Sequence, residues 1–185
     1  MRNSSTLGFI LFWVLFSSPS FGQATKDWQA KDVAYSLTLL GDVGDDTTKS
    51  SAVLQTVKKQ LILDKTSKKG VVFLGDNLYP NGLHKKESKY RMEDELRLNA
   101  QLDAVNIDDV DLVFIPGNHD WDRQGDEGFK KIQRQEKYIQ NYIEKGNVFR
   151  PSHGCPGPDV VKLANGLVLV AIDTQWWLHK YERGS

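Results

Sequence analysis

The chain is poor in cysteine, with one residue of this type, Cys155, among 185. A single cysteine excludes an internal disulfide framework and any zinc site of the Cys-x-x-Cys type. The sequence spacing also places no base beside Cys155, which argues against a catalytic thiol. Four histidines and many aspartates still allow a metal site made of oxygen and imidazole ligands.

The chain also lacks an excess of charge of either sign, because 24 basic residues balance 24 acidic ones. A net charge of zero gives no overall attraction to nucleic acids or anionic membranes, so we expect no nucleic-acid partner. Any affinity for phosphate must come from a local site. The length and the 39% hydrophobic content suit one globular domain.

A bilayer-spanning hydrophobic run is missing as well. The apolar run from Leu7 to Phe16 has about ten residues, whereas a transmembrane helix needs about twenty. Arg2 before this run, and Ser20 and Gly22 after it, predict a signal peptide over residues 1–22. We therefore expect export to the periplasm, the cell surface or the medium, with the globular domain over residues 33–185 and no transmembrane segment in the mature chain.

Short apolar runs alternate with helical patterns along the rest of the chain. Residues 35–40, 71–74, 112–115 and 167–172 predict buried strands. The apolar faces expected for the intervening helices are Val53, Val57 and Leu61; Met92, Leu96, Asn99 and Leu102; and Phe129, Ile132, Ile139, Tyr142 and Ile143. Asn165-Gly166 indicates a hairpin turn. Together these patterns predict an α/β fold with a largely parallel sheet.

Three of the predicted strands end in glycine or proline-glycine followed by polar residues: Asp42, Asp76 and the pair Asn118-His119. The carboxyl ends of parallel strands meet at one edge of a sheet, so these side chains are expected to converge. Oxygen and imidazole donors in such a group are typical of a two-metal site. Asp76 is the candidate bridge, because two neighbouring cations need a shared carboxylate. Either aspartate alone could instead cap a helix.

The segments Gly41–Gly44, Gly75–Tyr79 and Gly117–Asp120 resemble the motifs of the calcineurin-like metallophosphoesterases. The resemblance implies a layered fold of sheets flanked by helices and a metal-dependent hydrolase of phosphate esters. Most members carry a histidine where this chain has Gly44. Tyr79 instead resembles the tyrosine of the purple acid phosphatase branch.

The resemblance to that branch implies a dinuclear centre of Fe(III) with zinc, iron or manganese, and a metal-bound hydroxide as nucleophile. Asp42 and Tyr79 would bind the ferric ion, Asp76 would bridge, and Asn118 would bind the divalent ion. His119 would be catalytic, at the leaving group, with Asp120 holding its ring. The implied substrate is a small phosphate ester or a phosphoprotein.

The family completes its site with later histidines, including a Gly-His-x-His segment, that are not found in this chain. Its histidines are His84, His119, His153 and His179, and we expect His84 and His179 at the surface. The chain is therefore expected to be a C-terminally truncated part of a metallophosphoesterase domain, inactive and poorly soluble alone, in a protein that could carry a further C-terminal domain. The alternatives are a catalytically incomplete binding or scaffold domain, a nuclease of the same superfamily, and a phosphoacceptor domain modified at Asp42.

Overall fold

The computed structural model of the protein describes residues 32–45, 51–66 and 68–184, so the predicted signal peptide lies outside the described residues. The strands are β1 (Ser36–Leu40), β2 (Lys69–Phe73), β3 (Val110–Phe114), β4 (Asp159–Ala164) and β5 (Leu167–Ala171). The helices are α1 (Ala52–Leu63), α2 (Arg91–Val105), α3 (Gly128–Ile143) and the short α4 (Gln175–Leu178). Within the described part, no helix is both long and apolar enough to cross a membrane.

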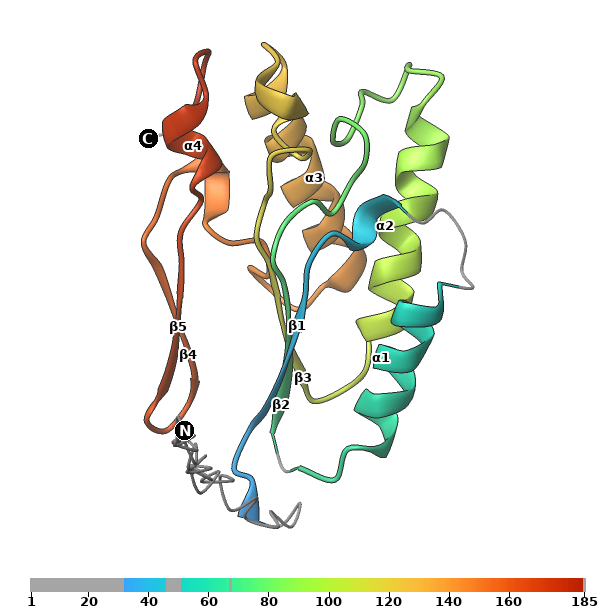
Figure 1. Cartoon of the computed structure of the whole chain (residues 1–185), viewed down its shortest axis with the longest axis vertical. Helices are drawn as coiled ribbons and strands as arrows, with labels where there is room; N and C mark the ends of the chain where they lie inside the picture. The colour runs from blue at the N-terminus through green and yellow to red at the C-terminus, as the bar shows by residue number, and fades with distance from the viewer. Residues whose placement is uncertain (1–31, 46–50, 67, 185) are drawn as a thin grey trace, which may run out of the picture.

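A parallel sheet with the strand order β1-β2-β3 forms the centre of the molecule. Helix α1 connects β1 to β2 and helix α2 connects β2 to β3, which confirms the predicted α/β fold with a parallel sheet flanked by helices (Figure 1). The fourth predicted strand does not join this sheet. It is β5, which pairs with β4 in an antiparallel hairpin, because the Asn165-Gly166 turn reverses the chain directly.

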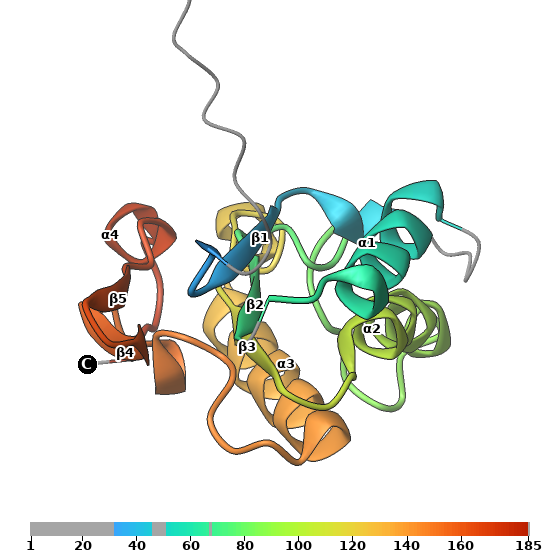
Figure 2. The same cartoon turned by 90° about the horizontal axis from the view of Figure 1, so that it is seen from below.

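The molecule is layered about the parallel sheet. Helices α1 and α2 lie on one side of the sheet, the β4–β5 hairpin lies on the other, and α3 runs beside β3 (Figure 2). The main core lies between the sheet and the helices, where the rings of Phe73 and Phe114 stack with centroids 4.1 Å apart. The carboxyl ends of β1, β2 and β3 all point to the same end of the molecule (Figure 1).

The predicted buried faces of the first two helices are partly wrong. Val53, Met92 and Leu96 are exposed, whereas Leu54 in α1 and Leu98 in α2 are buried. Helix α2 also buries polar and charged side chains, namely Arg91, Asp94 and Gln101. Hydrophobic spacing alone therefore misplaced the face of α2, because polar groups on that face bind the loop after β2.

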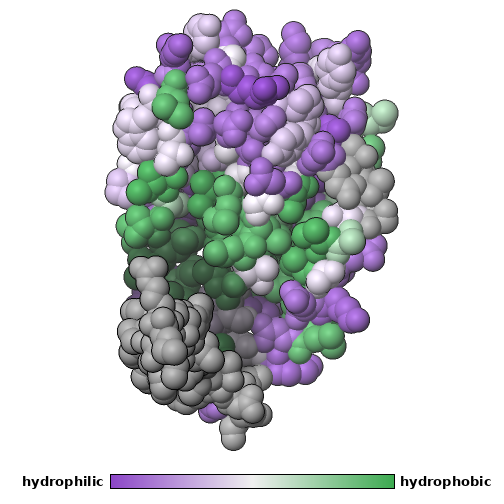
Figure 3. Space-filling model, viewed as in Figure 1, coloured by the Kyte–Doolittle hydropathy of each residue, from purple (hydrophilic) through white to green (hydrophobic). Residues whose placement is uncertain are grey.

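An apolar surface includes parts of β1 and of the β4–β5 hairpin. Its large aliphatic side chains are 39% to 61% exposed: Leu37, Leu39, Leu74, Val160, Val168, Val170 and Ile172. Figure 3 shows green atoms across this middle part of the molecule, below a mainly hydrophilic upper end. Contiguous exposed apolar groups of this kind mark contact surfaces, so this face differs in character from the rest of the described surface.

A buried aromatic contact ties the end of the hairpin to the loop after β3. The Trp121 indole N–H donates to Asp173 Oδ2 at 2.7 Å, and the Trp121 ring lies 4.8 Å from the ring of His179. The expectation of a surface His179 is therefore wrong, because its side chain closes over Trp121. Burial lowers the pKa of the His179 imidazole and raises the pKa of the Asp173 carboxyl to about 6.

Asp173 should make stability depend on pH in a defined direction. Its pKa of about 6 in the folded protein exceeds that of an unfolded aspartate, about 3.9, so the folded state binds the extra proton between these values. The stabilisation is complete below about pH 4 and is lost as the pH rises through 6. Relative to Asp173→Asn, the wild type should lose about 2 kcal/mol of unfolding free energy between pH 4 and 7.

Chemical denaturation of both proteins at pH 4, 5, 6 and 7 measures this difference. Asp126→Asn, at an exposed carboxylate, is the control and should leave the pH dependence unchanged. A constant difference between the wild type and Asp173→Asn across this range would contradict the assignment.

Candidate metal centre

Two aspartates leave the sheet in the same unusual backbone conformation. Asp42 follows β1 with φ of 57°, and Asp76 follows β2 with φ of 53°, both in the left-handed region that aspartate tolerates better than most residues. The Asp42 amide N–H donates to the carbonyl of Gly75, which ties the two turns together. The turns therefore direct both carboxylates to the same end of the sheet.

Side-chain oxygen atoms of Asp42, Asp76 and Tyr79 lie together at this end of the sheet and form an oxygen cluster. The Tyr79 hydroxyl lies 2.8 Å from Asp42 Oδ1 and 3.0 Å from Asp76 Oδ2. Adjacent oxygen ligands of an octahedral ion with bonds of about 2.1 Å lie about 3.0 Å apart. The Tyr79 oxygen is thus spaced from each carboxylate oxygen as two adjacent ligands of one cation would be, and the chemistry of the three groups suits a hard metal ion.

The surroundings of Tyr79 favour its protonated form. Burial raises the pKa of the phenol well above its usual value, and the two carboxylates that accept its proton raise it further. The hydroxyl proton of Tyr79 links its oxygen to the two carboxylates. A cation bound to the same three groups could replace this proton. A bound cation would reverse this effect, because its positive charge stabilises the phenolate.

Gly44 has no room for a side chain, which accounts for the absence of a histidine at that position. A Cβ atom there would overlap the backbone carbonyl groups of Asp76 and Asn77. The Gly44 N–H donates to Asp76 O, and its carbonyl accepts from the Tyr79 N–H at 3.2 Å. The segment that carries Tyr79 therefore packs against the backbone where a histidine would begin.

His119 lies beside Tyr79 at the edge of this group. The two ring centroids are 3.9 Å apart, and the His119 backbone N–H donates to Asp76 Oδ1 at 3.0 Å. The His119 Nδ1 atom is 2.6 Å from the carbonyl oxygen of Pro80. Since a carbonyl can only accept, Nδ1 carries the hydrogen, and Nε2 is the nitrogen left for exchange of a proton.

Asp120 does not hold the ring of His119, so that expectation is wrong. Its fully buried carboxylate accepts backbone N–H groups from Gly117, Asn77 and Leu78, and the Asn77 side-chain amide. Burial raises the pKa of Asp120 to about 7, although the N–H donors act in the opposite direction. Asp120 is a structural residue that joins the loops after β2 and β3, because these amide groups are the partners within its reach.

Other residues of the site went unnoticed in the sequence. Arg97 donates to the Tyr79 carbonyl at 2.9 Å, and Gln101, one turn further along α2, donates to the Asn77 carbonyl at 2.8 Å. Both side chains hold the backbone that carries Tyr79. The sequence offered only a weak indication of this role: two polar residues spaced i, i+4 on a helix whose apolar pattern predicted a different buried face.

The other histidine and asparagine side chains considered in the sequence do not join the oxygen cluster. Asn118 follows β3 at the same end of the sheet, but its side chain is exposed and makes no hydrogen bond among the described residues. His84 pairs with Asp94 at 2.8 Å instead. Across the described ranges, no three His, Cys, Asp or Glu side chains gather closely enough to hold a metal ion. Asp42, Asp76 and Tyr79 therefore fit one part of a dinuclear centre.

Comparison with known families decides the general identity. The family model described as calcineurin-like phosphoesterase matches residues 35–179. The chain belongs to the calcineurin-like phosphoesterase family. No curated protein and no solved structure matches it significantly. As a member, this calcineurin-like phosphoesterase is in general terms a metal-dependent hydrolase of phosphate esters, from a family that generally binds a dinuclear metal centre.

The packing at Gly44 predicts that alanine substitutions at Gly44 and Gly41 have very different effects on the free energy of unfolding. Gly44→Ala should lower the unfolding free energy by about 2 kcal/mol or more, because the added methyl overlaps the Asp76–Asn77 backbone. Gly41→Ala is the matched control: its Cβ would lie 4.0 Å from Leu74 Cβ, an ordinary contact. Thermal and denaturant unfolding measure both, and equal losses in the two variants would contradict the steric argument.

Proposed function

We propose that this chain contributes the Asp42, Asp76 and Tyr79 side of an exported, purple-acid-phosphatase-like phosphoesterase site containing Fe(III) and a divalent ion. The observation that carries the proposal is the convergence of the Asp42, Asp76 and Tyr79 oxygens at 2.8 and 3.0 Å. A phenolate is a hard, anionic ligand that favours a trivalent ion. The apolar run after Arg2 in the sequence supports export.

In this proposal each side chain has a distinct role toward the metals. Asp42 and Tyr79 would hold the ferric ion, Asp76 would be shared between the two ions, and the exposed Asn118 amide would bind the divalent ion. The metals, when bound, polarise the phosphate ester and supply a water of lowered pKa.

His119 has the role of an acid that assists the leaving group. Its Nδ1–H is fixed by the Pro80 carbonyl at 2.6 Å, and its ring lies beside the Tyr79 ring at a tilt of 32°, with the centroids 3.9 Å apart. When the ring is doubly protonated, its second proton is on Nε2, which gives it to the departing oxygen. Asp120 supports this geometry indirectly, since it holds the Gly117 and Asn77 amides on either side of the site.

The decisive test is the phosphatase activity of the full-length gene product loaded with iron and zinc, with p-nitrophenyl phosphate as substrate. Asp76→Asn should lower kcat by about a thousandfold or more, because the bridging carboxylate is lost. Asp126→Asn, at an exposed carboxylate, should leave kcat within about twofold. A folded full-length protein without activity toward phosphate esters would instead favour a binding or scaffold domain.

The role of Tyr79 has its own spectroscopic signature. Tyr79→Phe should abolish the visible charge-transfer band of the iron-loaded protein while keeping the fold, because a phenylalanine ring cannot coordinate Fe(III). Tyr90→Phe is the matched control, since Tyr90 is exposed and lies outside the oxygen cluster. An unchanged band in Tyr79→Phe would rule out the phenolate ligand.

A further inference from the structure

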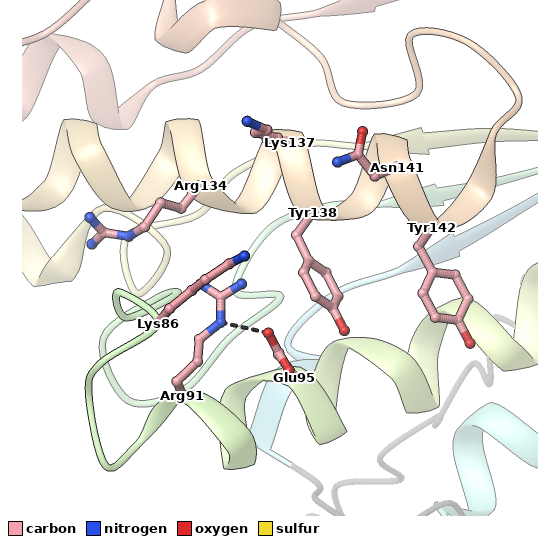
Figure 4. Close-up of a pocket in the computed structure, with 8 residues that line it drawn as sticks. All are labelled: Lys86, Arg91, Glu95, Arg134, Lys137, Tyr138, Asn141 and Tyr142. Atoms are coloured by element: carbon pink, nitrogen blue, oxygen red, sulfur yellow. Dashed lines mark hydrogen bonds and ion pairs between the residues drawn. The ribbon is translucent and has the colours of Figure 1, made fainter.

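A cavity of about 550 Å³ lies between α2 and α3, within the usual size range of about 300 to 1,000 Å³ for small-molecule sites. Lys86 contributes from the loop before α2, Arg91 from the start of α2, Arg134 and Lys137 from α3, and the Tyr138 ring forms part of the wall (Figure 4). None of the side chains of the oxygen cluster lines this cavity. It is therefore separate from the candidate metal centre.

The lining carries a strong local excess of positive charge. Its four cations face one carboxylate, Glu95, which is engaged by Arg91 Nε at 2.7 Å. Lys86 and Lys137 form no ion pair within the described residues, and Arg134 Nη2 is 3.6 Å from its acidic neighbour Glu127, beyond hydrogen-bond length. In a chain whose total charge is zero, two cations without an ion pair among the described residues, and a third in one longer ion pair, create a local site of positive potential around the cavity.

The cavity combines these cations with an aromatic wall. The Arg91 guanidinium lies 5.4 Å from the centroid of the Tyr138 ring, and the Tyr138 hydroxyl is used in a hydrogen bond to Asn99 Oδ1. The ring therefore offers its carbon surface to the cavity, while guanidinium and ammonium groups offer donors. Arginine side chains match the planar geometry of carboxylate and phosphate oxygens, and lysines add point charges.

The two arginines are held in place by the loop that follows Tyr79. Arg91 donates to the His84 carbonyl at 2.6 Å, and Arg134 Nε donates to the Leu83 carbonyl at 2.9 Å. These bonds to neutral carbonyl groups hold both guanidinium groups at the cavity, where Glu95 offsets the charge of Arg91 alone. The donors are thus already positioned, which reduces the entropic cost of binding an anion.

We propose that this cavity is a binding site for a small anion with at least two clustered negative groups, phosphate or carboxylate, apart from the metal centre. The proposal rests on the charges and packing of α2 and α3, and not on the proposed metal chemistry. It stands whether or not the protein binds iron.

Isothermal titration calorimetry on the full protein at low ionic strength tests it with two probes, methylenediphosphonate and citrate. Lys86→Gln/Lys137→Gln removes two cations that make no hydrogen bond, and should weaken binding of the preferred probe about tenfold or more. Lys59→Gln/Lys65→Gln removes the same charge from exposed positions outside the cavity and should change the dissociation constant less than twofold.

The outcomes separate the sources of the anion and the rival explanations. Tighter binding of methylenediphosphonate indicates a phosphate-type ligand, and tighter binding of citrate a carboxylate-type ligand. Absence of binding by both probes at about 1 mM would overturn the proposal. Equal weakening in the two double variants would overturn it too, as would a diphosphonate affinity unaffected by Lys86→Gln/Lys137→Gln, which would place the probe at the metal centre.

Discussion

The geometry of the site depends on one buried carboxylate, that of Asp120. It accepts amide hydrogens from Gly117 on the loop after β3, and from Asn77 and Leu78 on the loop after β2. An isolated buried charge would be costly, and these donors offset part of that cost. Because Asp76 and Tyr79 flank Asn77 and Leu78, the same interaction sets the positions of the candidate ligands.

Helix α2 serves two sites from one element. Arg97 and Gln101 hold the backbone around Tyr79, whereas Arg91 and Glu95 line the basic cavity toward α3. The loop from Tyr79 to Tyr90 connects the two sites, since it begins at the oxygen cluster and ends beside the basic cavity. The polar residues that α2 buries are therefore explained by its neighbours rather than by helix propensity.

Much of the fold and part of the site followed from local patterns. Short apolar runs ending in glycine and aspartate predicted the parallel strands and the meeting of Asp42 with Asp76, because strand ends in a parallel sheet share one edge. The face of α2, the burial of His179 and the partners of Asp120 were missed. Each depends on groups distant in sequence, such as Trp121 beside His179, which periodicity cannot register.

The sequence by itself determined the alternation of strands and helices, the glycine-aspartate exits and the family motifs, since these are encoded within a few residues of one another. Only the tertiary structure decided that the Tyr79 hydroxyl bridges the two carboxylates and that Gly44 leaves no space for a histidine. It also decided that cations from the loop before α2, from α2 and from α3 surround one cavity. The physical reason is that distances between segments arise from packing, and ligand geometry and local potential depend on those distances.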